Sequence, residues 1–373
     1  SAWYGHGGMG YLETGAQLHL DNDSFTSISL PFASTGYDGG LIYAEGGAAL
    51  ETIAITVEAA NARTGGMIYL DDQGTWSDEA SNLYDASALG NGGLLYAGDN
   101  TVITLTDTFV SLPVAAGANG GAFYGGTGVR FTGSGLYISG ATASNGSSTG
   151  GAIYLDSSHD LSLRDCTIED SSAWGSPAIY AYQGASLQID GCTLRNNVAT
   201  GSNYASAIFL NNPTGDMSIS SSSFSGNTGA VTTSGGANPV ATLSLRDCLF
   251  ESNSSDRAAV STEHNLSLSD SQFLDNSGDN GSSNTPGGAL FVSGGNTAIT
   301  DCRFEGNSAY EGAAIYADEP TSFILSGTHF DANRMTNAGG GLLLYHPTSA
   351  TIYNNWFCNN GSDSSSTSGG GAH

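Results

Sequence analysis

Two short acidic segments hold the side chains of this sequence that could bind a metal ion. Asp71 and Asp72 are adjacent, and Asp21 and Asp23 flank a single asparagine. Carboxylate oxygens in a turn are the ligands that calcium prefers. Neither segment has the spaced ligands of a recognised calcium loop, so solvated turn residues are the simpler interpretation. Asp21, Asp23, Asp71 and Asp72 therefore remain weak calcium candidates, and we otherwise expect neither a metal nor a cofactor.

Polysaccharide cleavage is the enzymatic alternative. In pectin hydrolases an Asp-Asp pair precedes a Gly-His-Gly segment, whereas here Gly5-His6-Gly7 comes before Asp71-Asp72. A lyase needs an arginine or lysine base beside acidic calcium ligands, and this sequence contains no lysine. We therefore expect no catalytic residue, and a polysaccharide lyase or hydrolase is the second hypothesis.

Histidines and cysteines do not form a recognisable site in the sequence. None of the seven histidines pairs with another at the spacing of metal ligands. Four of the five cysteines occupy the same place in a repeat, two residues before a large apolar residue: Cys166, Cys192, Cys248 and Cys302. This regularity predicts stacked free thiols in a core and not a disulfide framework.

A repeat of about 28 residues runs through the chain. Its first signature is a glycine pair followed by an alternating strand, and equivalent positions recur in 13 steps at Gly10, Ile42, Ile68, Leu95, Phe123, Ile153, Ile179, Ile208, Val231, Val260, Leu290, Ile315, Leu342 and His373. From residue 150 a second signature, Phe-x-x-Asn, is added, with the phenylalanines at 224, 250, 273, 304, 330 and 357. Glycine, serine and aspartate between short apolar stretches indicate strands and turns, and no window has a helical period.

These repeats predict an all-β fold, a single parallel β-helix of about 13 coils. We expect one continuous domain over 1–373, with the glycine signature alone in 1–149 and both signatures in 150–373. Crossovers between parallel strands are nearly always right-handed, so the helix is expected to be right-handed. Equivalent phenylalanines should stack inside, and equivalent asparagines should bond to one another. The missing Phe-x-x-Asn signature predicts a different turn in the first 150 residues.

The paired signatures also resemble those of a known family. Gly150-Gly151-Ala152-Ile153 and Gly287-Gly288-Ala289-Leu290 alternate with Phe-x-x-Asn in a way similar to the repeats of the chlamydial polymorphic outer membrane proteins. The likeness covers residues 150–373, whereas the first 150 residues share only the glycines. Members of that family are autotransporter passengers, so the resemblance implies a surface adhesin. The absence of lysine is a departure from the family.

Alternation within each strand places a line of aromatic residues on the outer side. Because Ile153 and Leu155 face the core, Ala152 and Tyr154 should face outward. The predicted binding or assembly face consists of Tyr43, Tyr69, Tyr96, Tyr124, Tyr154, Tyr180, Phe209, Phe291 and Tyr316, preceded by Tyr11 and interrupted by Thr232 and Ser261. A patch of this length is larger than a monomer usually exposes, so it is expected to contact a glycan, a host protein or another copy of the chain.

The formal net charge of −27 excludes nucleic acid and anionic membrane surfaces as partners. The leading hypothesis is a non-enzymatic structural or adhesive protein, extracellular or at the surface of a bacterium or archaeon. It would act either as an adhesin-like passenger or as a fibre subunit that stacks end to end. The expected end-to-end interface comprises Trp3, Tyr4, Gly369, Gly370, Gly371 and His373.

Overall fold

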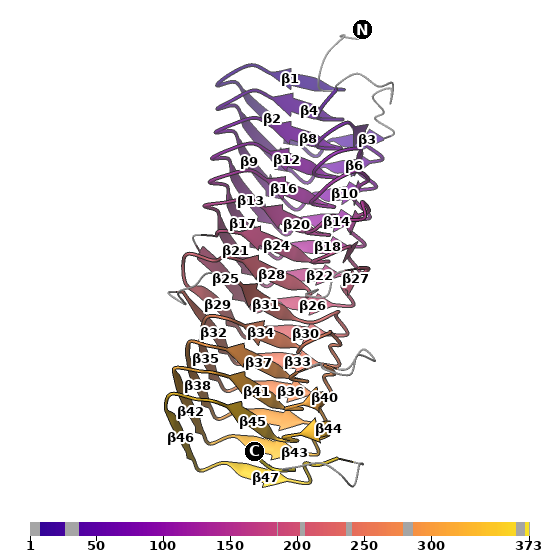
Figure 1. Ribbon diagram of the computed structural model, residues 1–373. Coiled ribbons are helices and arrows are strands. Elements are labelled where there is room, and N and C mark those ends of the chain that lie inside the picture. The colour runs from indigo at the N-terminus through magenta and orange to yellow at the C-terminus, as the bar shows by residue number, and fades with distance from the viewer. Residues whose placement is uncertain are drawn as a thin grey trace. The chain divides into compact units, whose positions relative to one another are not determined.

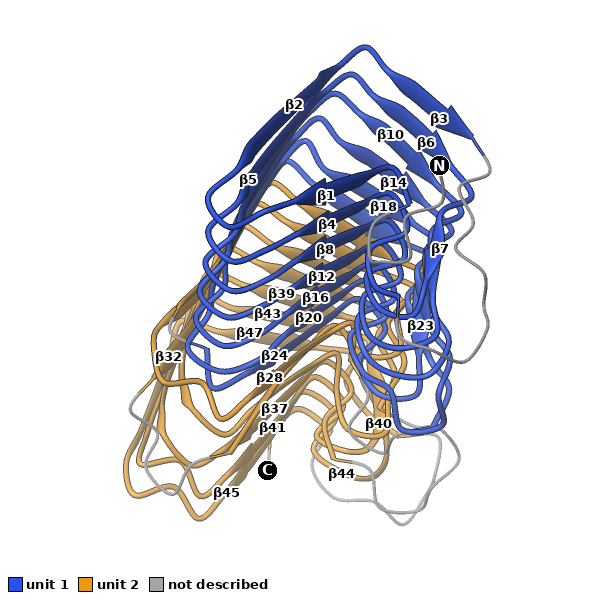
Figure 2. Cartoon of the chain, turned by 90° about the horizontal axis from the view of Figure 1, so that it is seen from above, with its two compact units in different colours: residues 1–185, 197–202 blue, residues 186–196, 203–373 orange. Residues whose placement is uncertain are grey.

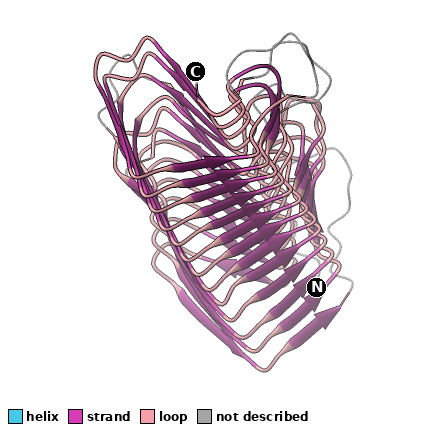
Figure 3. Cartoon of the chain, turned by 90° about the horizontal axis from the view of Figure 1, so that it is seen from below, coloured by secondary structure: helices cyan, strands magenta, loops and turns pink. Residues whose placement is uncertain are grey.

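Short parallel strands make up every regular element of the protein. The computed structural model describes residues 8–26, 37–184, 186–201, 206–235, 241–278, 286–362 and 370–372. Within these ranges there is no helix, and all paired strands run parallel (Figures 1 and 3). No helical segment in this part of the chain could cross a membrane. The predicted all-β parallel β-helix is therefore confirmed.

The chain divides into two compact units (Figure 2). Unit 1 comprises residues 1–185 and 197–202, and unit 2 comprises residues 186–196 and 203–373. The division does not coincide with residue 150, where the second sequence signature begins. The expectation of one continuous domain over 1–373 stays a prediction.

Four sheets of stacked strands form unit 1. Sheet A contains β1 (Gly10–Leu12), β4 (Ile42–Ala44), β8 (Ile68–Leu70), β12 (Leu95–Ala97), β16 (Phe123–Gly125), β20 (Ile153–Leu155) and β24 (Ile179–Tyr182). Sheet B contains β2 (Gln17–Asp21), β5 (Ala49–Ile53), β9 (Thr75–Glu79), β13 (Val102–Thr106), β17 (Arg130–Ser134) and β21 (Asp160–Arg164). Sheet C contains β3 (Ser24–Thr26), β6 (Thr56–Glu58), β10 (Asn82–Tyr84), β14 (Phe109–Ser111), β18 (Tyr137–Ser139) and β22 (Thr167–Glu169). Sheet D contains β7 (Asn61–Ala62), β11 (Ser87–Ala88), β15 (Val114–Ala115), β19 (Thr142–Ala143), β23 (Ser172–Ala173) and β27 (Val198–Ala199).

Unit 2 repeats the A, B and C positions. Its A strands are β28 (Ile208–Asn211), β31 (Val231–Ser234), β34 (Val260–Thr262), β37 (Leu290–Ser293), β41 (Ile315–Asp318) and β45 (Leu342–Tyr345). The B strands are β25 (Ser186–Asp190), β29 (Met217–Ser220), β32 (Thr242–Arg246), β35 (Asn265–Ser269), β38 (Asn296–Thr300), β42 (Ser322–Ser326) and β46 (Ala350–Tyr353). The C strands are β26 (Thr193–Arg195), β30 (Ser223–Ser225), β33 (Leu249–Glu251), β36 (Gln272–Leu274), β39 (Arg303–Glu305), β43 (His329–Asp331) and β47 (Trp356–Cys358), and β40 (Ser308–Glu311) pairs with β44 (Arg334–Ala338).

The two glycines of the repeat signature have different structural roles. The first has a positive φ, as in Gly92 (66°), Gly120 (69°) and Gly150 (65°). The second allows the backbone of the D strand to come close: a Cβ on Gly121 would lie 2.7 Å from backbone atoms of Thr142 and 1.9 Å from the carbonyl oxygen of Gly151. The first glycine is thus favoured by its positive φ, while the second is required because no side-chain atom fits there.

Stacked phenylalanines and asparagines organise the interior of unit 2. The rings at 224, 250, 273, 304, 330 and 357 stack with centroids 4.5–5.2 Å apart. The asparagine ladder consists of Asn227, Asn253, Asn276, Asn307, Asn333 and Asn360. Each of the first five donates its backbone N–H and its Nδ2 to Oδ1 of the next, at 2.8–3.1 Å. The predicted stacking of equivalent residues is confirmed.

The corresponding corner of unit 1 is built differently, as the sequence predicted. Ala60, Ala86, Pro113 and Ala141 stand where unit 2 has its asparagines. These apolar residues cannot form an amide ladder, and the chain continues from them into the paired strands of sheet D. The equivalent position of unit 2 is also paired, through single bridges between Thr228, Ser254, Ser277 and Ser308. The two corners therefore share backbone pairing, and unit 2 adds the side-chain ladder of asparagines.

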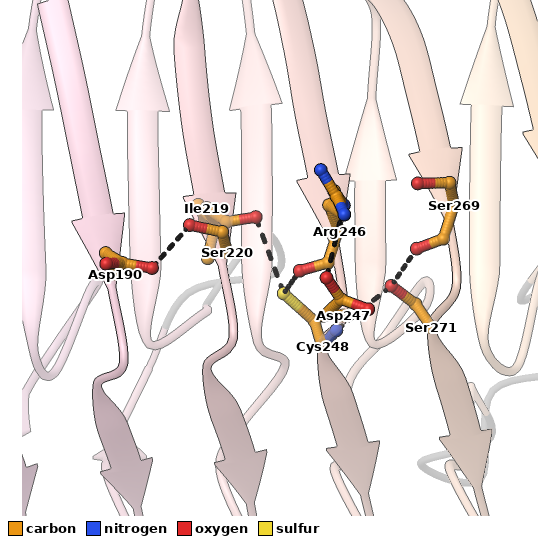
Figure 4. A network of polar contacts seen from close by, with 8 residues as sticks. All are labelled: Asp190, Ile219, Ser220, Arg246, Asp247, Cys248, Ser269 and Ser271. Atoms are coloured by element: carbon orange, nitrogen blue, oxygen red, sulfur yellow. Dashed lines mark hydrogen bonds and ion pairs between the residues drawn. The ribbon is translucent and has the colours of Figure 1, made fainter.

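A column of cysteines and hydroxyl residues lines the corner between sheets B and C. In unit 2 the backbone N–H of Cys192 donates to Ser222 Oγ, and that of Cys248 donates to Ser271 Oγ, at 3.0 and 3.1 Å. The Cys248 thiol donates to the carbonyl oxygens of Arg246 and Ile219 (Figure 4). All five cysteines are free thiols, and burial raises the pKa of Cys248 to about 11. The Cys248 thiol therefore caps backbone carbonyl groups and is not an activated nucleophile.

Candidate functional site

A ladder of seven tyrosines runs along sheet A of unit 1. The tyrosine ladder consists of Tyr11, Tyr43, Tyr69, Tyr96, Tyr124, Tyr154 and Tyr180, each the second residue of its strand. Strand pairing places every member directly beside the next. Neighbouring A-strand residues such as Ile153 and Leu155 are buried, so the two-residue period of the strand directs the tyrosines away from the core.

The rings of the ladder stack face to face. Successive centroids lie 4.8–5.4 Å apart, and successive planes differ by 3–11°. Each inner ring therefore has both faces covered by its neighbours. A sugar that binds an aromatic residue does so on the ring face, so the inner tyrosines cannot stack on a glycan in this way. The ladder presents ring edges and phenolic hydroxyls.

The outer side of sheet A is only partly exposed, which corrects the prediction that it faces solvent. The residue preceding each strand lies on the same side as the tyrosine, yet Leu41, Met67, Leu94, Ala122 and Ala152 are at most 1% exposed. The D-strand backbone approaches the second glycine at this end of the strand. The tyrosines themselves are half-buried, except Tyr11, which is exposed.

Four consecutive tyrosines have hydroxyls that the described part of the protein leaves without a hydrogen-bond partner: Tyr69, Tyr96, Tyr124 and Tyr154. Burial raises the pKa of Tyr124 to about 12, and it also raises the pKa of the other three. Nearby carboxylates, including Asp71, Asp99 and Asp156, raise these pKa values further. The four phenols therefore stay protonated at neutral pH and can donate and accept hydrogen bonds.

Carboxylates flank the ladder at the corner that follows the A strands. Asp72 Oδ1 accepts the backbone N–H of Asp99, and Asp99 Oδ1 accepts that of Thr127, both at 2.8 Å. Asp156 Oδ1 accepts the N–H of Ser157 at 2.8 Å. Each of these carboxylates has one oxygen in the corner and a second oxygen for which the described residues supply no partner. The face is therefore negatively charged along one edge.

One arginine lies close to the ladder, and an acid already holds it. Arg63 Nε and Nη2 donate to Asp38 Oδ1 and Oδ2 at 3.0 and 2.6 Å, and the Asp38 side chain is buried. This bond is the main reason that the pKa of Arg63 is raised, and Tyr69 also contributes. The pair contributes no net charge, so it does not neutralise the carboxylates of the corner.

The predicted face differs in unit 2. Phe291 is 6% exposed, and the guanidinium of Arg257 lies over its ring at 5.0 Å. Phe291 and Tyr316 stack at 5.6 Å, while Thr232 and Ser261 are buried at the positions where the tyrosines of unit 1 are half-exposed. The prediction that Phe291 belongs to an exposed binding face is wrong. Phe209 and Tyr316 are half-buried.

Two features of unit 1 were not found by sequence reasoning. Tyr84, Phe109 and Tyr137 form a second aromatic group on sheet C, with the ring centroids of Phe109 and Tyr137 stacked 5.0 Å apart.

The second feature lies inside the coil. Asp78 is 4% exposed and accepts hydrogen bonds from the hydroxyls of Thr52, Ser81 and Thr108 at 2.5 Å. The alternation in Trp76-Ser77-Asp78 could have shown that Asp78 faces inward.

The remaining candidate residues do not form a common site. Asp21 is the last residue of β2, Asp23 precedes β3, and both are exposed. Asp71 and Asp72 follow β8. In the described ranges no group of three or more histidines, cysteines and acids could hold a metal ion. Gly370 and Gly371 accept backbone bonds from Gly341 and Leu342. Trp3, Tyr4, Gly369 and His373 lie outside the described residues, so the end-to-end interface stays a prediction.

Two histidines that could have done chemistry are part of the interior. His159 and His264 are buried, and their Nδ1 atoms lie 2.6 Å from the carbonyl oxygen of Asp156 and 3.1 Å from Thr233 Oγ1. Burial lowers the pKa of both imidazoles. They are therefore neutral residues of the core at neutral pH.

The stacked parallel sheets agree with a comparison against family models. The family described as right handed beta helix region matches residues 66–242 and 206–373, which together make up well over half of the chain. The chain belongs to the right-handed β-helix family. The predicted hand of the helix is thereby supported, whereas the finer resemblance to the polymorphic outer membrane protein repeats is not confirmed. Searches of curated proteins and of solved structures found no match.

Folding should suppress the ionisation of the tyrosine ladder. Because folding raises the pKa of Tyr124 to about 12, against about 10 in an unfolded chain, the unfolded state loses protons first as the pH rises. The folded state should therefore lose stability above pH of about 10. We expect the phenolate absorbance of the ladder to appear only when the protein unfolds. Circular dichroism measures the unfolding. Ionisation of these tyrosines at pH of about 10 in a fully folded chain would contradict this prediction.

Proposed function

We propose that this β-helix is a non-enzymatic adhesive protein of the cell surface or the extracellular space, and that the tyrosine ladder is its binding face. The observation that carries the proposal is a run of four half-buried tyrosines whose hydroxyls have no partner in the described protein. Polar groups at a half-buried surface lose hydrogen bonds to water, and a partner that supplies hydrogen bonds compensates for this loss. A repeated row of such groups suits an extended or repetitive partner.

The buried polar groups support a non-enzymatic role. Cys248 and Cys302 have pKa values raised to about 11 and about 12 by burial. The buried histidines and Asp78 bond to the coil interior. These groups are occupied in holding the fold and cannot reach a substrate. The β-helix family is also compatible with a polysaccharide-active enzyme, so turnover has to be measured directly.

The test compares two triple variants of unit 1 on an array of glycans and cell-surface proteins. Replacing Tyr69, Tyr96 and Tyr124 by serine should reduce binding at least tenfold, since it removes three adjacent hydroxyl and edge contacts. The control replaces Tyr84, Phe109 and Tyr137 on sheet C by serine, which removes the same number of rings from another face. Circular dichroism reports whether each variant is folded.

Three outcomes would overturn parts of the proposal. Equal binding by both folded variants would exclude the ladder as the binding face. Shortened or unsaturated products from acidic polysaccharides would make the protein an enzyme. Polymers of the purified chain, seen by electron microscopy without any ligand, would favour the fibre subunit over the adhesin.

A further inference from the structure

The geometry of the ladder restricts what it can bind, if the proposed function holds. Between Tyr69 and Tyr154 the ring centroids are 4.8, 5.1 and 5.0 Å apart and the planes are nearly parallel. The ring faces are covered, so neither sugar stacking nor a cation–π contact is possible at the inner rings. What remains is a row of phenolic oxygens separated by apolar ring edges.

The carboxylates select the charge of the partner. Asp71 acts electrostatically on Tyr69 and Tyr96. Asp99 acts on Tyr96 and Tyr124, and Asp156 acts on Tyr124 and Tyr154. Arg63 is bound by Asp38, and the sequence contains no lysine. An anionic polymer would be repelled along this edge, whereas a cationic one would be attracted.

The cation that fits is a primary ammonium group. Guanidinium groups bind best to both oxygens of a carboxylate or to a ring face. Here the ring faces are covered, and Asp99 and Asp156 each have one oxygen bound to a backbone N–H. An ammonium group has three N–H donors in flexible directions and can share them between one phenolic oxygen and one carboxylate oxygen. Its methylene stem can pack along the ring edges.

We propose that the tyrosine ladder of unit 1 binds an extended, lysine-rich protein segment, whose ammonium groups donate to the hydroxyls of Tyr69, Tyr96 and Tyr124 and to the Asp71 and Asp99 carboxylates. The chain supplies the acceptors, and the partner supplies the donors and the positive charge. This assignment names the partner of the proposed adhesive face and depends on that function.

Poly-L-lysine and its Nε-trimethylated form are the probes, because they carry the same charge and only the first has N–H donors. Titrating the full chain at physiological ionic strength should show at least tenfold tighter binding of the unmodified polymer. Replacing Tyr69, Tyr96 and Tyr124 by phenylalanine keeps the stacked rings and removes the hydroxyls. This variant should bind poly-L-lysine about tenfold more weakly and bind the trimethylated polymer as before.

A matched pair of charge variants separates local contacts from the overall negative charge. Asp71→Asn with Asp99→Asn should weaken binding to poly-L-lysine, whereas Asp107→Asn with Asp165→Asn changes the net charge equally on exposed corners between sheets B and C. Equal affinity for the two polymers, or equal losses in the two charge variants, would overturn the inference. If the serine variant of the ladder still loses binding to a non-basic partner on the array, the proposed adhesive function stands and only the lysine-rich partner is excluded.

Discussion

Replacing Asn276 by leucine is expected to lower the free energy of unfolding by about 4 kcal/mol. Asn276 is fully buried in the asparagine ladder, and its Nδ2 donates to the carbonyl oxygen of Phe250 at 2.9 Å. Its Oδ1 accepts the backbone N–H and the Nδ2 of Asn253 at 3.1 and 3.0 Å. Leucine has a similar size but leaves the buried backbone N–H of Asn253 without its partner, at about 1–3 kcal/mol. It also removes one hydrogen bond each from the Phe250 carbonyl and from Asn253 Nδ2, which keeps its bond to the carbonyl oxygen of Phe224, at about 1 kcal/mol each.

Urea unfolding followed by circular dichroism measures this effect, with Asn337→Ala as the control. Asn337 is exposed, and its Nδ2 donates to the Glu311 side chain at 2.5 Å. Losing that surface bond should cost less than about 1 kcal/mol. A loss of similar size in the two variants would show that the ladder does not hold unit 2 together.

Gly121→Ala is expected to destabilise unit 1 by about 4 kcal/mol or more, from a single added methyl group. The new Cβ would lie 1.9 Å from the carbonyl oxygen of Gly151 and 2.7 Å from backbone atoms of Thr142. Because these atoms belong to paired backbone segments and not to flexible side chains, they cannot move away without breaking the strand pairing around β19. The effect is steric, since Gly121 does not have a positive φ.

The matched control is Gly146→Ala, which adds the same methyl group elsewhere in unit 1. A Cβ on Gly146 would meet nothing within 4 Å, so the thermal midpoint should be unchanged or slightly raised. Comparable stability of the two alanine variants would refute the role that we assign to the second glycine of the repeat signature. If only Gly121→Ala gives a lower yield of folded protein, that result would agree with the role assigned to the second glycine.

Both variants concern the scaffold that positions the tyrosine ladder. The ladder is regular because each A strand is held in register by the glycine pair before it and by the corner after it. Loosening unit 1 at Gly121 should therefore also spoil the spacing of the neighbouring Tyr96, Tyr124 and Tyr154. Asn276→Leu acts in unit 2 and leaves the ladder residues of unit 1 unchanged, which makes it a second control for binding experiments.

Much of this protein follows directly from its sequence. In a parallel solenoid, equivalent residues lie one strand spacing apart, so a repeat in the sequence becomes a column in space. For this reason the strands, the stacked phenylalanines, the asparagine ladder and the line of tyrosines could all be predicted from spacing alone. The different corner of unit 1 also followed, because Ala60, Ala86 and Pro113 cannot form an amide ladder.

Tertiary structure decided which parts of the outer face remain accessible. The sequence placed Phe291 in one exposed series with the tyrosines, yet Arg257 from a preceding loop lies over its ring. Likewise, Leu41 and Met67 alternate outward from the core and are nevertheless buried. Strand alternation states on which side a residue lies, whereas its exposure depends on what the connecting segments place over that side. The ring stacking that covers the faces of the tyrosines is also a property of three-dimensional packing, and it limits the ladder to recognition through edges and hydroxyls.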